Sequence, residues 1–157
     1  QNLETSAINS PFFNVFLAAQ VHGSDNSLMM NGTKVRDLIT TMGDIHHIFP
    51  KGYLQKNGIT EKSKYNQIAN YTYLDTQTNI SIGEKAPNEY FSTVCEQCVS
   101  KALKYGNITD ETLLKENLRV NCIPENIVSM DIMNYEDFLL ERRKLMAKKI
   151  KDYYYSL

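Results

Sequence analysis

Asp44–Pro50 reads DIHHIFP, and this stretch decides the fold. Its aliphatic and aromatic residues predict a β-strand over Ile45–Phe49 that ends at the proline. A second apolar stretch, Ala69–Leu74, predicts the partner strand, and Thr76–Ile82 predicts a short helix directly behind it. We therefore expect a ββα unit, with the polar stretch Lys56–Tyr65 as an exposed loop between the strands.

Two histidines and two asparagines give this unit side chains suited to phosphodiester cleavage. His46 and His47 are adjacent, Asn70 follows 23 residues after His47, and Asn79 follows 9 residues later. Such cleavage requires a base that activates water and a cation that holds the scissile phosphate and stabilises the leaving oxygen. A single histidine in such a stretch is more often a core residue held by a backbone carbonyl. The combined pattern favours the chemical interpretation.

The run HHIFPKGYL, followed by NQIANYTYLDTQTNISIGEKAPNEYF, resembles the C-terminal nuclease domain of GmrSD-like restriction proteins. That domain belongs to the HNH class of the ββα-metal superfamily. The resemblance is strongest over Asp44–Phe91, and the stretch CIPENIVSMDIMNYEDFLLERRKLMAKKIKDYYYSL is similar to the end of these proteins, where an FLxxRRxxL helix closes the chain. It implies an α+β fold, in which a mostly helical domain surrounds a small ββα-metal (HNH) finger.

The resemblance implies a role for each of the four side chains. His47 is the expected general base, since a neutral imidazole can take a proton from water near neutral pH. His46 and Asn79 are the expected metal ligands, although Asn79 departs from the final histidine that names the class. The cation would therefore be held loosely, with phosphate and water as further ligands. Asn70 is expected to bond across the finger and fix the backbone that carries the base, or else to be an ordinary strand-end asparagine.

The expected cofactor is a divalent metal. Mg or Mn is expected, and because an imidazole is a softer ligand than a carboxylate, Ni or Zn should be tolerated. Lys51 and Lys85 are candidate phosphate contacts on either side of the site, although each could equally be a solvated surface lysine. Asp44 has two open roles, to orient His46 or to add a ligand.

The charge balance does not indicate a basic nucleic-acid surface, since the formal net charge is −1. Asp44–Phe91 carries five basic and five acidic residues. Glu141–Asp152 differs, with six basic residues against two acidic ones. That segment is a candidate phosphate-binding face or, equally, a solvated helix face. Its basic residues include Arg142, Arg143, Lys148 and Lys149.

The three cysteines argue against a disulfide framework, which favours a reducing cytoplasm. Cys95 and Cys98 have the CxxC spacing of half a zinc site, but they fall on one face of a helical pattern with Phe91, Val94, Val99, Ala102 and Leu103. Buried structural cysteines are therefore the preferred interpretation. The sequence has no apolar run long enough for a membrane span.

The remaining segments predict helices within one domain over residues 1–157. The first begins at Pro11 behind the cap Ser10 and ends at Gly23, and a short one lies around Val35–Ile39. The third begins at the cap Asn88 and runs to about Tyr105, where Gly106 ends it. The last two span about Asp110–Arg119 and the segment from Asn134 onward. The finger would span about 44–91 and the C-terminal helices about 110–157. Because the chain opens at Gln1, we expect it to be the C-terminal fragment of a longer protein.

The expected function is a metal-dependent HNH DNA endonuclease or nickase that acts in restriction of foreign or phage DNA. The resemblance implies a ParB-like nucleotide-hydrolysing domain upstream, and this chain itself lacks GxxxxGK[ST] and GxGxxG phosphate-binding motifs. The alternative is a nucleic-acid-binding or regulatory module with a degenerate, inactive finger. A weaker alternative is a zinc-binding structural domain.

Overall fold

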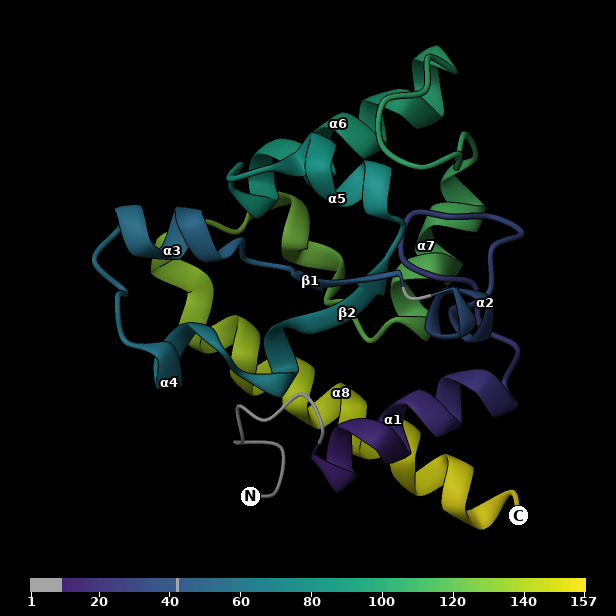
Figure 1. Ribbon diagram of the computed structural model, residues 1–157. Coiled ribbons are helices and arrows are strands. Elements are labelled where there is room, and N and C mark those ends of the chain that lie inside the picture. The colour runs from purple at the N-terminus through teal and green to yellow at the C-terminus, as the bar shows by residue number, and fades with distance from the viewer. Residues whose placement is uncertain (1–9, 42) are drawn as a thin grey trace.

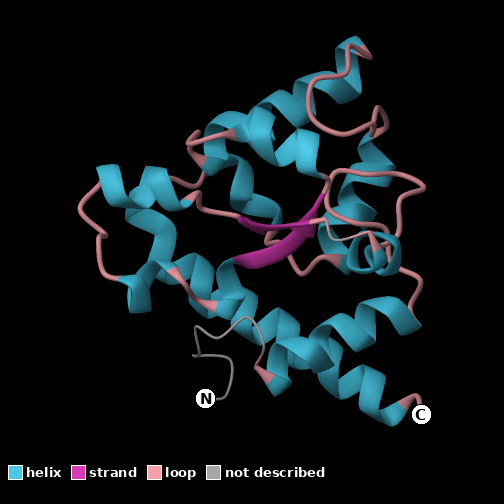
Figure 2. Cartoon of the chain, viewed as in Figure 1, coloured by secondary structure: helices cyan, strands magenta, loops and turns pink. Residues whose placement is uncertain are grey.

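The computed structural model describes residues 10–41 and 43–157, and it has the predicted α+β class. Helices dominate, and the described residues contain a single two-stranded antiparallel sheet (Figure 2). The sheet lies at the centre of the molecule, with α5 (Thr76–Ile82) and α6 (Pro87–Ser100) on one side and α1 (Pro11–His22) and α8 (Tyr135–Tyr155) on the other (Figure 1). The two strands are thus enclosed by helices from both ends of the chain.

The predicted ββα order is present. β1 (Asp44–His47) pairs antiparallel with β2 (Tyr71–Leu74), so that the last residue of β1 faces the first residue of β2. α5 follows β2 directly, and the Asp75 side chain caps it by accepting from the Thr78 backbone N–H at 3.0 Å. This short connection brings α5 back against β1.

The segment between the strands is more ordered than the sequence predicts. It contains α3 (Lys51–Lys56), α4 (Lys62–Tyr65) and the 3₁₀ turn η1 (Ile68–Asn70). The prediction of an exposed loop over 56–65 is wrong at its end, because Tyr65 is only 3% exposed. Its ring packs beside His47, with 6.5 Å between ring centroids, and this contact ties the segment to β1.

The flanking helices follow their capping signals in part. α1 begins after Ser10, whose side chain accepts from the Phe12 N–H, and it ends at Gly23, as predicted. α6 begins after Ala86 rather than at Asn88, and it ends at Ser100 because Lys101 adopts a left-handed conformation, so the predicted extension to Tyr105 is wrong. The other elements are α2 (Val35–Thr40), α7 (Glu111–Val120), and the 3₁₀ turns η2 (Glu125–Ser129) and η3 (Ile132–Asn134).

The predicted cysteine face is only partly buried. Cys98 lies in the core, but Cys95 is exposed, and Val99 and Leu103 are 85% and 59% exposed. The buried stripe of α6 passes through Phe91, Val94 and Cys98, and Cys95 and Val99 lie beside it on the solvent side. The prediction is therefore wrong for Cys95, Val99 and Leu103.

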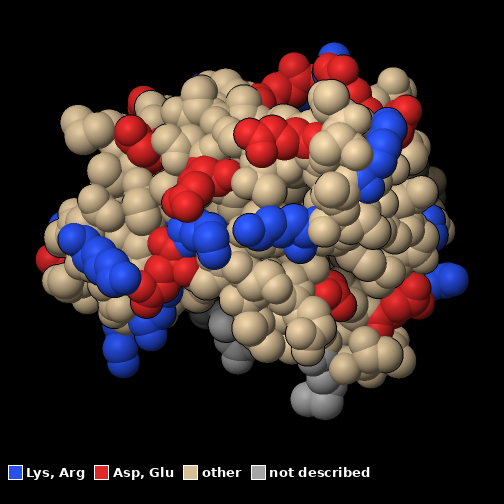
Figure 3. Space-filling model, turned by 90° about the horizontal axis from the view of Figure 1, so that it is seen from above, with Lys and Arg blue, Asp and Glu red and all other residues tan. Residues whose placement is uncertain are grey.

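The predicted basic face of the last helix is wrong for Arg142, whereas Lys144, Lys148 and Lys151 are exposed, in agreement with a solvated face. Arg142 is fully buried, Lys149 pairs with Asp25 at 2.6 Å, and Lys148 pairs with Asp152 at 2.7 Å. On the face shown in Figure 3, basic and acidic side chains alternate without a continuous basic surface. Across residues 10–41 and 43–157, every helix is too short or too polar to cross a membrane.

Candidate functional site

His46 and Asn79, which the sequence analysis pairs, lie in direct contact. His46 projects from β1 and Asn79 from α5, and the Nδ1 atom of His46 is 2.7 Å from the Oδ1 atom of Asn79. The Asn79 amide N–H donates to the Asp44 carboxylate at 3.0 Å. Because a carboxylate only accepts, this bond keeps the amide oxygen directed at His46. Asp44 therefore orients Asn79, a role that the sequence did not suggest.

Tyr90 is the second neighbour of His46, and sequence reasoning missed it. Its hydroxyl lies 3.3 Å from the His46 Nε2 atom and donates to the Ile48 carbonyl oxygen. The side chain is fully buried on α6. In the sequence Tyr90 is one more residue of an apolar helical stripe, so the position of its hydroxyl was not visible.

His46 is neutral at physiological pH. It is 2% exposed, and burial lowers its pKa from 6.5 to about 4. The hydrogen bond to Asn79 opposes that effect, whereas the charges of His47 and Arg142 lower the pKa further. A neutral imidazole carries one N–H and one lone pair.

The two neighbours of His46 suit its two neutral tautomers. With the proton on Nδ1, the ring donates to the Asn79 oxygen; with the proton on Nε2, it donates to the Tyr90 hydroxyl. In the second tautomer the Nδ1 lone pair and the Asn79 oxygen lone pair converge on one point. Two convergent lone pairs repel each other unless a cation binds both, so the donor set fits a metal ion.

His47 lies among a different set of residues. Its Nε2 atom is 2.9 Å from the Asn66 Oδ1 atom, and its ring meets the edge of Tyr71 at 5.2 Å between centroids. An amide oxygen only accepts, so Nε2 carries the proton and Nδ1 is the basic nitrogen. Burial lowers the pKa of His47, the bond to Asn66 raises it, and the Lys51 charge lowers it. Asn66 follows directly after the segment Lys56–Tyr65 that was interpreted as a loop, and no sequence pattern marked it.

The two histidines point to opposite faces of β1, as adjacent strand residues do. The hydrogen-bond partners of His46 are on α5 and α6, whereas His47 bonds to Asn66 at the end of α4. The charge of His47 still lowers the pKa of His46, so the two rings are electrostatically coupled. The fold thus joins His46 to Asn79 by direct contact and joins His47 to that pair only through the strand.

Asn70 connects β2 to the residues that follow His47. Its side chain accepts from the Phe49 N–H at 2.8 Å and donates to the Phe49 carbonyl at 3.0 Å. Its own carbonyl accepts from the Ile48 N–H at 2.9 Å. Asn70 is fully buried, so these bonds hold the backbone after His47 in a single place.

The two candidate lysines differ in the contacts that their ammonium groups make. The Lys85 ammonium donates to the Ser81 and Ile82 carbonyls at 3.1 and 3.4 Å, which completes the C-terminus of α5. Lys51, in the first turn of α3, is exposed and lies 5.3 Å above the Tyr65 ring. Lys51 is therefore the better candidate for a phosphate contact beside His47.

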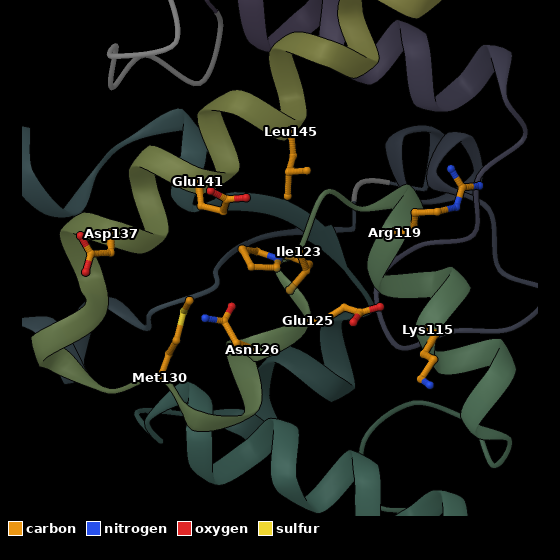
Figure 4. Close-up of a pocket in the computed structure, with 10 residues that line it drawn as sticks. Lys115, Arg119, Ile123, Glu125, Asn126, Met130, Asp137, Glu141 and Leu145 are labelled. Atoms are coloured by element: carbon orange, nitrogen blue, oxygen red, sulfur yellow. The ribbon is translucent and has the colours of Figure 1, made fainter.

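A pocket of about 580 Å³ lies away from these residues, between α7, η2 and α8, and Figure 4 shows side chains of both charge signs around it. None of the catalytic, metal-binding or phosphate-binding residues predicted from the sequence lines this pocket. Within residues 10–41 and 43–157, no three His, Cys, Asp or Glu side chains are grouped closely enough to hold a metal. A cation at His46 and Asn79 would thus take its other ligands from substrate and water.

Comparison with known proteins does not assign the site. No model of a known protein family matches the chain, and no solved structure matches it. An uncharacterized protein of Methanocaldococcus jannaschii is 30% identical in an alignment of 117 positions, which covers 67% of this chain and 20% of that protein. The chain therefore spans about a fifth of the length of this relative.

Proposed function

We propose that this chain is a metal-dependent DNA endonuclease or nickase of the HNH class, related to the C-terminal nuclease domain of GmrSD-like restriction proteins. The observation that carries the proposal is the contact between His46 and Asn79, at 2.7 Å, on a strand and helix arranged in ββα order. Asp44 supports it, because it directs the amide oxygen of Asn79 at the imidazole.

His46 and Asn79 would hold the divalent cation, which supplies Lewis-acid stabilisation of the phosphate oxygens when bound. Mg or Mn is the proposed ion, and the imidazole ligand should also allow Ni or Zn. The Tyr90 hydroxyl accepts from Nε2 in the tautomer that leaves the Nδ1 lone pair free. Hydrogen bonds of this kind orient a histidine ligand and raise its basicity.

His47 would act as the general base. Its lowered pKa keeps the imidazole neutral near pH 7, and Asn66 leaves Nδ1 as the nitrogen that accepts a proton. Water deprotonated by Nδ1 would attack phosphorus in line and displace the 3′ oxygen, which takes up a proton from a solvent water, so that 5′-phosphate and 3′-hydroxyl ends result. Because His47 is the last residue of β1, the scissile phosphate would lie at this end of the strand, with Lys51 beside it.

The proposed setting is restriction of foreign DNA, with an upstream ParB-like domain supplying selectivity. This part of the proposal depends on the resemblance over Asp44–Phe91 and on the similar C-terminal stretch. The mixed charge on the surface agrees with weak DNA binding by this chain alone (Figure 3).

A second candidate is a nucleic-acid-binding module with an inactive finger. It is favoured by the burial of His46, which is 2% exposed, and by the opposite directions of the two histidines. Under this alternative, His46, Asn79 and Asp44 form a structural hydrogen-bond network with no metal. The two candidates differ in whether the chain binds a divalent cation and nicks DNA.

The first test is nicking of supercoiled plasmid at low salt with Mg or Mn. His47→Ala should reduce the rate by about a hundredfold to ten-thousandfold, which is the usual contribution of a general base. His22→Ala is the matched control, because His22 is exposed and lies edge-on to Tyr153, with 5.2 Å between ring centroids, outside the site. Nicking at the wild-type rate by His47→Ala would refute the base assignment.

The second test is calorimetric titration with Mn. His46→Ala and Asn79→Ala should bind the ion more weakly, and their nicking should partly recover at high Mn concentration. Unchanged affinity in both variants would show that the ligands are wrong. If the wild-type chain binds no divalent ion and does not nick, the structural alternative is correct.

A further inference from the structure

Arg142 on α8 is an unusual buried cation. It is the largest fully buried side chain, and its Nη1 group donates to the Ala69 and Tyr71 carbonyls at 3.0 and 2.6 Å. Nη2 donates to the Asn121 carbonyl at 3.2 Å, and the guanidinium lies 5.7 Å from the centroid of the Phe16 ring. In the part of the chain that the structure describes, no carboxylate pairs with it and its Nε atom has no hydrogen-bond partner.

Such an arrangement is costly, since a buried charge loses its hydration. Burial lowers the pKa of Arg142 to about 10, which still leaves the guanidinium charged at neutral pH. A leucine or methionine at this position would fill the core without that cost. The bonds that Arg142 makes are therefore the feature that requires explanation.

The two carbonyls bound by Nη1 flank Asn70. Arg142 thus holds the peptide unit before Asn70 and the one after Tyr71. Between them, the Asn70 side chain binds the Phe49 backbone and the Asn70 carbonyl accepts from the Ile48 N–H. A continuous series of hydrogen bonds leads from α8 through Asn70 to the residue after His47. The neighbouring Arg143 makes no such contact and donates to the Gln67 side chain at 3.1 Å.

We propose that Arg142 is a positioning residue: its guanidinium fixes Asn70 and, through it, the backbone that carries His47. The effect of Arg142 on catalysis rests on the proposed function, whereas its effect on the position of His47 does not. Nη1 donates to the carbonyls of residues 69 and 71 while Nη2 reaches the Asn121 carbonyl, and the shorter lysine side chain, with its single nitrogen, cannot span these three carbonyls together. The C-terminal helix would then contribute to the nuclease site through the contacts of Arg142 with residues 69 and 71.

The test compares Arg142→Lys with Met146→Ala in the same protein. Met146 is fully buried one turn further along α8 and makes no hydrogen bond to residues 69–71. Its truncation therefore destabilises the core and leaves the hydrogen bonds from Arg142 to the carbonyls of residues 69 and 71 in place. Both variants are measured at a temperature where urea titration shows them folded. The readouts are the NMR signals of the Asn70 side-chain amide and the His47 ring in metal-free protein, and kcat and KM for plasmid nicking.

Arg142→Lys should shift both sets of NMR signals and lower kcat by about tenfold to a hundredfold, with KM within about twofold of wild type. Met146→Ala should leave the signals and kcat near wild type. Unchanged His47 and Asn70 signals in Arg142→Lys, or equal losses in Met146→Ala, would overturn the proposal. If the wild-type chain does not nick DNA, the proposed function fails, while the NMR comparison still decides whether Arg142 positions His47.

Discussion

His46 should make the metal-free protein less stable in acid. Its pKa is about 4 in the folded protein and 6.5 when the ring is exposed. Between these values the unfolded chain binds a proton that the folded protein does not, so the free energy of unfolding falls as the pH falls. The stability from neutral burial is fully present above about pH 6.5 and is lost as the pH falls to about 4.

The magnitude follows from the same two values. The gap between 6.5 and about 4, at about 1.4 kcal/mol for each pH unit, corresponds to about 3 kcal/mol of unfolding free energy. That loss is a large fraction of the roughly 5–15 kcal/mol by which domains are stable. A bound cation would oppose it, because metal and proton compete for the same imidazole nitrogen.

The assay is urea unfolding at pH 4, 5, 6 and 7 in the presence of a chelator, for the wild type and for His46→Gln. Carboxylates titrate in the same range, so the quantity of interest is the difference between the two proteins. The unfolding free energy of the wild type minus that of His46→Gln should fall by about 3 kcal/mol from pH 7 to pH 4. Parallel stability curves for the two proteins would refute the buried neutral imidazole.

Three further outcomes are expected. The Lys51 charge lowers the pKa of His47, so Lys51→Met should shift the acid limb of the nicking rate, measured against pH, to higher pH. An acid limb at the wild-type pH would argue against this coupling. Gly106→Ala should lower the urea midpoint, because Gly106 has a φ of +63° and an added Cβ would collide with the Met29 carbonyl, and a wild-type midpoint would contradict that packing. Cys95 should react with Ellman's reagent in the folded protein, whereas the buried thiols of Cys98 and Cys122 should react only after unfolding. Equal reaction rates for the three thiols in the folded protein would contradict this burial.

Local signals were sufficient for the ββα order and for the first helix. Ser10 caps α1 through its own side chain, and Asp75 caps α5 in the same way, so each helix start depends on residues within three positions. The pairing of β1 with β2 was also predicted, because both strands are short apolar runs bounded by polar segments. The contact between His46 and Asn79 then follows from a helix that folds back directly after β2.

The environment of each site residue required the tertiary structure. His47 bonds to Asn66 and His46 faces Tyr90, which lie 19 and 44 residues away along the chain, and no sequence pattern marks either residue as a partner of a histidine. A sequence shows which residues can donate or accept. The packing of α4 and α6 against β1 decides which of them meet.

Arg142 shows the difference most clearly. It lies four residues from both Phe138 and Met146, so its spacing places it on the buried stripe of α8, while its charge indicates the solvent side. The sequence by itself determined the helix and the stripe, because both depend on a local period. Only the tertiary structure decided the conflict, because the carbonyls of residues 69, 71 and 121 that bind the buried guanidinium come from distant parts of the chain.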